Sequence, residues 1–118
     1  MKQETFNIVA RHLLEQGAVS MRAGRDMCGY RGSGGMKCAA GILIPDDRSR
    51  DGLEGFSADE GEVAKILEEL GHDTQLVRDL QEVHDFGNPS QWRIRLAEVG
   101  ERHHLSIDVL TTRGPESE

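Results

Sequence analysis

Apolar residues recur every three or four positions along most of the chain, which is the spacing of one face of an α-helix. The first such stripe consists of Phe6, Val9, Ala10, Leu13 and Leu14. It predicts a helix over residues 4–16, ended by Gly17 in the position where a glycine commonly closes a helix. His12 lies off the stripe, so we expect a solvated side chain there.

A second stripe follows a polar loop in the middle of the chain and consists of Val63, Ile66, Leu67 and Leu70. Ser57 and Glu60, three positions apart, have the form of a capping box in front of it. Gly71 follows its last apolar residue, so the pattern predicts a helix that begins near Ser57 and ends before Gly71.

Two further helices are predicted in the last third of the chain. Their inner stripes are Leu76, Val77, Leu80 and Val83, and then Trp92, Leu96 and Val99. The first is capped by Asp73 or Thr74, and the second begins with Asn88 and Pro89, a typical N-cap and first helical residue. His84 borders the first stripe, and residues 105–110 fit either a last helical turn or a short strand.

Residues 27–47, which we call the central segment, break this regular pattern. They hold both cysteines, the single tyrosine, a glycine cluster and the apolar run 38–44. One backbone consistent with them is a β-hairpin around residues 32–34 that sets Cys28 opposite Cys38. The other is a short buried helix that begins near Lys37 and stops before Pro45. We favour the helix, because alanines at 39 and 40 are poor strand residues.

The sum is a mainly α fold: four to five helices in a small bundle, with a short extended segment or β-hairpin near residues 27–38. We expect a single domain over residues 1–118, with a frayed tail at 111–118. The formal net charge of −7 argues against a general nucleic-acid binder. The sequence shows neither a membrane-length apolar run nor a signal peptide, so we expect a cytoplasmic protein with reduced cysteines.

The cysteines and histidines of the chain do not match the known residue spacings of catalytic or metal-binding sites. Cys28 and Cys38 lie too far apart for a zinc knuckle, and a tetrahedral site would need histidines such as His84, His103 or His104, which show no ligand spacing. Cys38 at a helix start next to a lysine is conceivable as a nucleophile with His84 as its base, but a packed core cysteine fits better. We therefore predict no catalytic residue, metal or cofactor.

The glycine-rich turn before the short helix is the second candidate site. Backbone N–H groups and cations at such a junction attract anions, although the P-loop pattern is not met. Its anion- or nucleotide-binding residues are Arg31, Gly32, Gly34, Gly35 and Lys37. A small-ligand binding protein is accordingly the alternative function, and a thiol or metal enzyme the least favoured one. Tyr30, between a glycine and Arg31, fits a binding anchor for a partner.

The central segment also carries a resemblance. Cys28-Gly-Tyr30-Arg31, followed by Gly-Met-Lys-Cys-Ala-Ala-Gly-Ile-Leu-Ile-Pro-Asp-Asp over residues 35–47, resembles a family of small phage and prophage proteins. Residues 53–55, the stretch around His84 and the helix of Trp92 are similar to the rest of that family. The likeness covers about residues 5–105 and brings no catalytic residue with it.

The resemblance implies a phage or prophage accessory protein. Because small acidic proteins of this kind often bind and block host proteins, we expect a non-enzymatic protein whose partner is a host protein in the host cytoplasm. Such proteins include inhibitors of host defence complexes, and acidic faces can occupy nucleic-acid sites on those targets. The expected partner-binding residues are Tyr30, Arg31, Lys37, Glu60, Glu62, Glu68 and Glu69.

Overall fold

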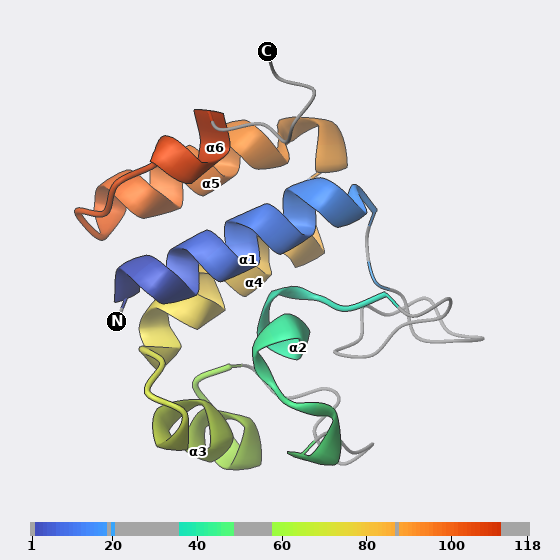
Figure 1. The fold of residues 1–118 in the computed structure, drawn as a ribbon, viewed down its shortest axis with the longest axis vertical. Helices are drawn as coiled ribbons and strands as arrows, with labels where there is room; N and C mark the ends of the chain where they lie inside the picture. The colour runs from blue at the N-terminus through green and yellow to red at the C-terminus, as the bar shows by residue number, and fades with distance from the viewer. Residues whose placement is uncertain (1, 19, 21–35, 49–57, 87, 112–118) are drawn as a thin grey trace.

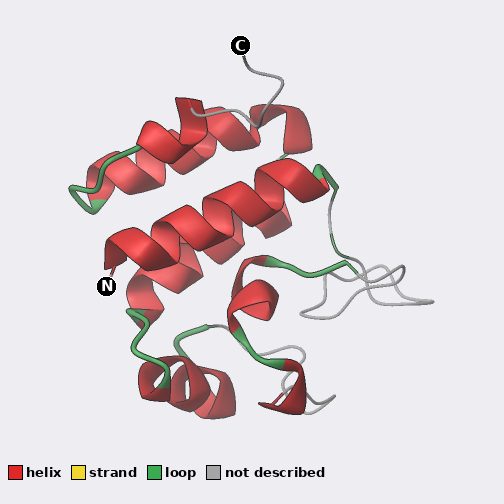
Figure 2. Cartoon of the chain, viewed as in Figure 1, coloured by secondary structure: helices red, strands yellow, loops and turns green. Residues whose placement is uncertain are grey.

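Helix α1 (Lys2–Gln16) runs through the middle of the molecule, with α4 (Thr74–Phe86) and α5 (Trp92–Arg102) packed along it (Figure 1). The computed structural model describes residues 2–18, 20, 36–48, 58–86 and 88–111. Within these ranges six α-helices and no strand occur (Figure 2). The mainly α prediction is therefore confirmed, and the four long predicted helices are present.

The remaining helices are short or lie at one end of the molecule. They are α2 (Ala39–Leu43), α3 (Gly61–Glu69) and α6 (Asp108–Thr111), with 3-10 turns at Asp46–Arg48 and Pro89–Gln91. Helix α2 contacts both α1 and α4, whereas α6 covers the α1–α5 side (Figure 1). The predicted short helix is present at residues 39–43, and residues 108–111 form a helical turn rather than a strand. Residues 27–35 of the alternative hairpin and residues 112–118 of the predicted frayed tail lie outside the described residues.

The apolar stripes read from the sequence form the core. Phe6, Leu13, Ile66, Leu80 and Leu96 are all fully buried. Helix α5 approaches closely at Gly100, because a Cβ atom there would lie 2.7 Å from Cγ2 of Ile107 and 3.1 Å from Cζ of Phe6. No helix in the described part of the chain has the length and apolar character that a membrane span needs.

Helix α3 begins later than the capping box predicts. Its first residue is Gly61, and Glu60 is the N-cap, with no side-chain capping bond. Gly61 has a φ of +53°, a left-handed conformation that cannot lie inside a right-handed helix, so the helix cannot include residues 58–60. The capping-box prediction, which made Glu60 the third helical residue, is therefore wrong; Ser57 lies outside the described residues.

The ends of α3 and α5 share one geometry. At α3, the N–H of His72 donates to Leu67 and that of Gly71 to Glu68, and Gly71 adopts a φ of +89°. This is a Schellman ending, and it confirms the predicted role of Gly71. At α5 the same left-handed position is held by His104, with a φ of +59°. A histidine is strained there, since its Cβ crowds the backbone that a glycine leaves open.

Candidate functional site

The described part of the central segment enters α2 through Cys38. This residue is the N-cap of α2, and its Sγ accepts a hydrogen bond from the N–H of Gly41 at 3.4 Å. Its side chain is buried, at 1% exposure. The predicted helix start near Lys37 is therefore confirmed, and Cys38 is the packed core cysteine that we favoured. The other half of the alternative hairpin, including Cys28, lies outside the described residues.

The last turn of α1 clamps the backbone just before this cap. Gln16 accepts the N–H of Lys37 through Oε1 at 3.0 Å and donates from Nε2 to the Lys37 carbonyl at 2.9 Å. His12 Nε2 lies 2.8 Å from the same carbonyl and donates to it. The expectation that His12 is only solvated is wrong, because this side of α1 faces the central segment rather than water.

Helix α4 holds the other side of the segment. Gln81 accepts the N–H of Ala40 through Oε1 at 2.9 Å, which satisfies one of the donors left open at the start of α2. Its Nε2 donates to Oδ1 of Asp85 at 2.7 Å. Two glutamines on different helices thus supply the hydrogen-bond partners of the backbone here. Gln16 binds the backbone of Lys37 just before α2, and Gln81 binds the N–H of Ala40 in its first turn.

His84 extends this polar cluster into the core. Its ring is fully buried and stacks on Trp92, with 5.7 Å between the ring centroids. Nε2 accepts the N–H of Ser20 at 2.8 Å, so the ring proton is on Nδ1, which donates to Asp85 at 2.8 Å. Both ring nitrogens are occupied, and His84 is not positioned as a base for Cys38.

Two more histidines link parts of the chain that are distant in sequence. His72 Nδ1 lies 2.7 Å from Oγ1 of Thr5, and burial lowers the pKa of this histidine. His103 Nε2 lies 2.7 Å from Oδ2 of Asp79 and ties the end of α5 to α4. In the part of the chain that the structure describes, no group of three or more His, Cys, Asp or Glu side chains is arranged to hold a metal ion.

Helix α3 turns its polar side to solvent at the far end from α5 (Figure 1). We call the exposed Glu60, Glu62, Glu68 and Glu69 the acidic face; Lys65 of the same helix is exposed as well. Glu69 accepts a hydrogen bond from Arg48 at 2.6 Å, which raises the pKa of that guanidinium. The four predicted glutamates are therefore exposed on α3 or at its N-cap, together with Lys65.

Of the other predicted binding residues, the structure describes only Lys37. Lys37 is half-buried, and its backbone is held by α1. Tyr30, Arg31, Gly32, Gly34 and Gly35 lie outside the described residues, so the anion-binding turn stays a prediction. Gln16 and Gln81, which the sequence reasoning missed, carry no local signal, because their partners are 21 and 41 positions away.

Comparison of the chain with family models, with curated proteins and with solved structures finds no match. The resemblance to phage and prophage proteins accordingly stays a prediction from the motif of the central segment. The site must be interpreted from its own geometry.

Proposed function

We propose that this chain is a non-enzymatic accessory protein of phage or prophage origin that binds a host protein through the acidic face of α3. The observation that carries the proposal is the exposure of Glu60, Glu62, Glu68 and Glu69 on α3 and at its N-cap. Carboxylates in this arrangement fit a basic surface on a partner, which they attract over long range and orient on contact.

The titratable residues in the core serve as structural hydrogen-bond partners, which supports a binding role over catalysis. His12, His72, His84 and His103 each hold a backbone or side-chain group in place, and the thiol of Cys38 is buried under α2. These contacts stabilise the fold, and we assign the binding role to the exposed acidic side chains of α3 and its N-cap instead.

The partner class follows from charge. Host proteins that bind nucleic acid present Lys- and Arg-rich surfaces, and those surfaces are complementary to the acidic face. We infer an inhibitor that occupies such a surface, in the manner of an anti-defence protein acting on a nucleic-acid-guided complex. The motif resemblance of the central segment points to the same biological setting.

The test is capture of host proteins on the immobilised chain. We expect a basic, nucleic-acid-binding protein to be retained, and its retention to fall as salt is raised from 0.05 to 0.5 M, concentrations at which the Debye length falls from roughly 14 to about 4 Å. Glu62→Lys with Glu68→Lys should abolish capture without changing the free energy of unfolding by more than about 0.5 kcal/mol, since both side chains are exposed.

The matched control is Glu15→Lys with Glu101→Lys, which makes the same change in net charge on exposed positions of α1 and α5. This control should retain the captured protein. Equal loss in both double variants would show that capture reports net charge alone, and equal retention in both would remove the acidic face from the interface.

A further inference from the structure

The chain turns back on itself after α5 and lays residues 105–111, which we call the strap, against the α1–α5 pair (Figure 1). Leu110 of the strap is buried, at 2% exposure. Ile107 lies against Gly100 of α5, next to the ring of Phe6 from α1. The strap therefore covers part of the apolar core, on the side where α1 and α5 meet.

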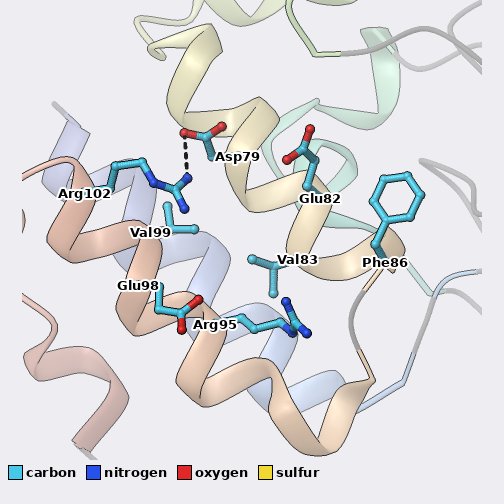
Figure 3. A pocket seen from close by; sticks show the side chains of 8 residues that line it. All are labelled: Asp79, Glu82, Val83, Phe86, Arg95, Glu98, Val99 and Arg102. Carbon is cyan, nitrogen blue, oxygen red and sulfur yellow. Dashed lines mark ion pairs between the residues drawn. The ribbon is translucent and has the colours of Figure 1, made fainter.

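The end of α5 is fixed to α4 immediately before the strap begins. Arg102 forms an ion pair with Asp79 of α4, with 3.5 Å between Nη1 and Oδ2 (Figure 3). Nε2 of His103 lies 2.7 Å from the same oxygen, and the side chains of His103 and Asp79 are only 11% and 12% exposed. Polar pairs shielded from water are screened less than exposed ones, so α5 stays attached to α4 up to this point.

His104, the next residue, is a strained hinge. Its φ of +59° makes it the one non-glycine residue with a left-handed backbone among the described residues. The Cβ of a histidine crowds the backbone in this conformation, and such strain is released when the residue returns to an ordinary conformation. The strain thus acts against the closed strap, exactly where the anchored part of α5 ends.

Hydrogen bonds at the exposed start of the strap hold it closed. Gln3 of α1 accepts the N–H of Ser106 through Oε1 at 2.8 Å and donates from Nε2 to the Ser106 carbonyl at 2.9 Å. Each such bond stabilises the closed form only modestly, because water replaces it on opening. Helix α6, with four residues, is too short to persist without its contacts to α1 and α5, so an open strap is also unfolded.

From this arrangement we infer that the strap is a releasable cover, which opens as one unit about His104 while the longer helices stay folded. The anchored end of α5 sets where the opening stops, and the clamp made by Gln3 sets how firmly the strap is closed. Opening exposes the apolar side chains of the strap and the side of α1 and α5 beneath them. No residue of the strap belongs to the acidic face, so the inference stands independently of the proposed host interaction.

The test is hydrogen exchange of single backbone amides of the full chain, measured by NMR under conditions in which closing is faster than chemical exchange. The reporters are Leu110, whose N–H donates to the Ile107 carbonyl at 3.0 Å, and Leu80 in the middle of α4. We expect the protection of Leu110 to be at least about tenfold lower than that of Leu80. In about 1 M urea only Leu80 should lose protection, since local opening exposes little surface. Equal protection with equal urea dependence would overturn the inference.

A core substitution far from the strap supplies a second readout. Ile66→Val changes a fully buried side chain of α3 and should speed the exchange of Leu80 by about three- to tenfold, because α3 is unfolded in the state from which Leu80 exchanges. The exchange of Leu110 should stay within about 1.5-fold, since α3 remains folded when only the strap opens. A Leu110 amide that follows Leu80 in this variant would show that the strap opens only with the whole protein.

Substitutions at the clamp and the hinge should move the exchange of Leu110 in opposite directions. Gln3→Ala removes the clamp and should speed it at least about fivefold. Asn7→Ala is the matched control, because it removes the 3.0 Å bond between Gln3 Nε2 and Asn7 Oδ1 but leaves both bonds to Ser106, and it should change the rate less than about twofold. His104→Gly removes strain from the closed form and should slow exchange about two- to fivefold. Faster exchange in His104→Gly, or equal rates in Gln3→Ala and Asn7→Ala, would refute this account of the strap.

Discussion

Replacement of His84 by phenylalanine tests whether this buried histidine is structural. A phenylalanine keeps an aromatic ring against Trp92 but removes both ring nitrogens. The N–H of Ser20 loses its acceptor at a fully buried position, which costs about 1–3 kcal/mol, and the lost contact to Asp85 adds about 0.5–1.5 kcal/mol. We therefore expect His84→Phe to lower the free energy of unfolding by about 2–4 kcal/mol.

The assay is urea unfolding followed by circular dichroism and by the fluorescence of Trp92, the single tryptophan. With a urea slope of about 2 kcal/mol per M for a domain of this size, the midpoint should fall by about 1–2 M. His84→Gln is the control, because its Oε1 can take the place of Nε2 as acceptor for Ser20, and it should lose about half as much. A His84→Phe variant within about 0.5 kcal/mol of the original protein would refute the structural role of these hydrogen bonds.

Three further substitutions test other features of the fold. Gly100→Ala sets a methyl group 2.7 Å from Ile107 and should destabilise the protein by about 1–3 kcal/mol in the same urea assay; an unchanged midpoint would contradict the close approach of α5. His104→Gly relieves the left-handed strain and should stabilise by about 0.5–1 kcal/mol, whereas a loss of stability would show that the histidine side chain matters more than its backbone. The pKa of His72 is lowered by burial, so the unfolded chain takes up the proton first and stability falls as pH drops below about 6.5. His72→Asn, which can keep a bond to Thr5, should lose less stability between pH 7 and the lowered pKa; parallel pH profiles would contradict this linkage.

The long helices could be predicted because the helical spacing of their apolar residues is also what brings those residues into the core. The stripe of α4 repeats at the helical period and faces the core, and Gly71 supplies the left-handed residue that ends α3. The start of α3 was mispredicted because Ser57 and Glu60 match a capping pattern, while the deciding feature is the left-handed conformation of Gly61. Such a conformation depends on how the preceding loop enters the core.

The polar contacts around α2 could not be predicted in the same way. Gln16 and Gln81 bind backbone groups of residues brought near them only by the tertiary fold. The sequence placed His84 at the border of an apolar stripe, and the structure buries it completely between Ser20 and Trp92. The residues that hold the start of α2 therefore come from helices far along the chain, which the local sequence around residues 37–40 does not indicate.

The central claim is that the acidic face of α3 occupies a basic nucleic-acid site on a host protein. The most direct measurement is the amount of nucleic acid that the captured host protein releases when this chain is added. We predict release by the original chain and by the Glu15→Lys/Glu101→Lys control, and none by Glu62→Lys/Glu68→Lys. A host protein that keeps its nucleic acid while this chain is bound, or equal release by both double variants, would contradict the claim.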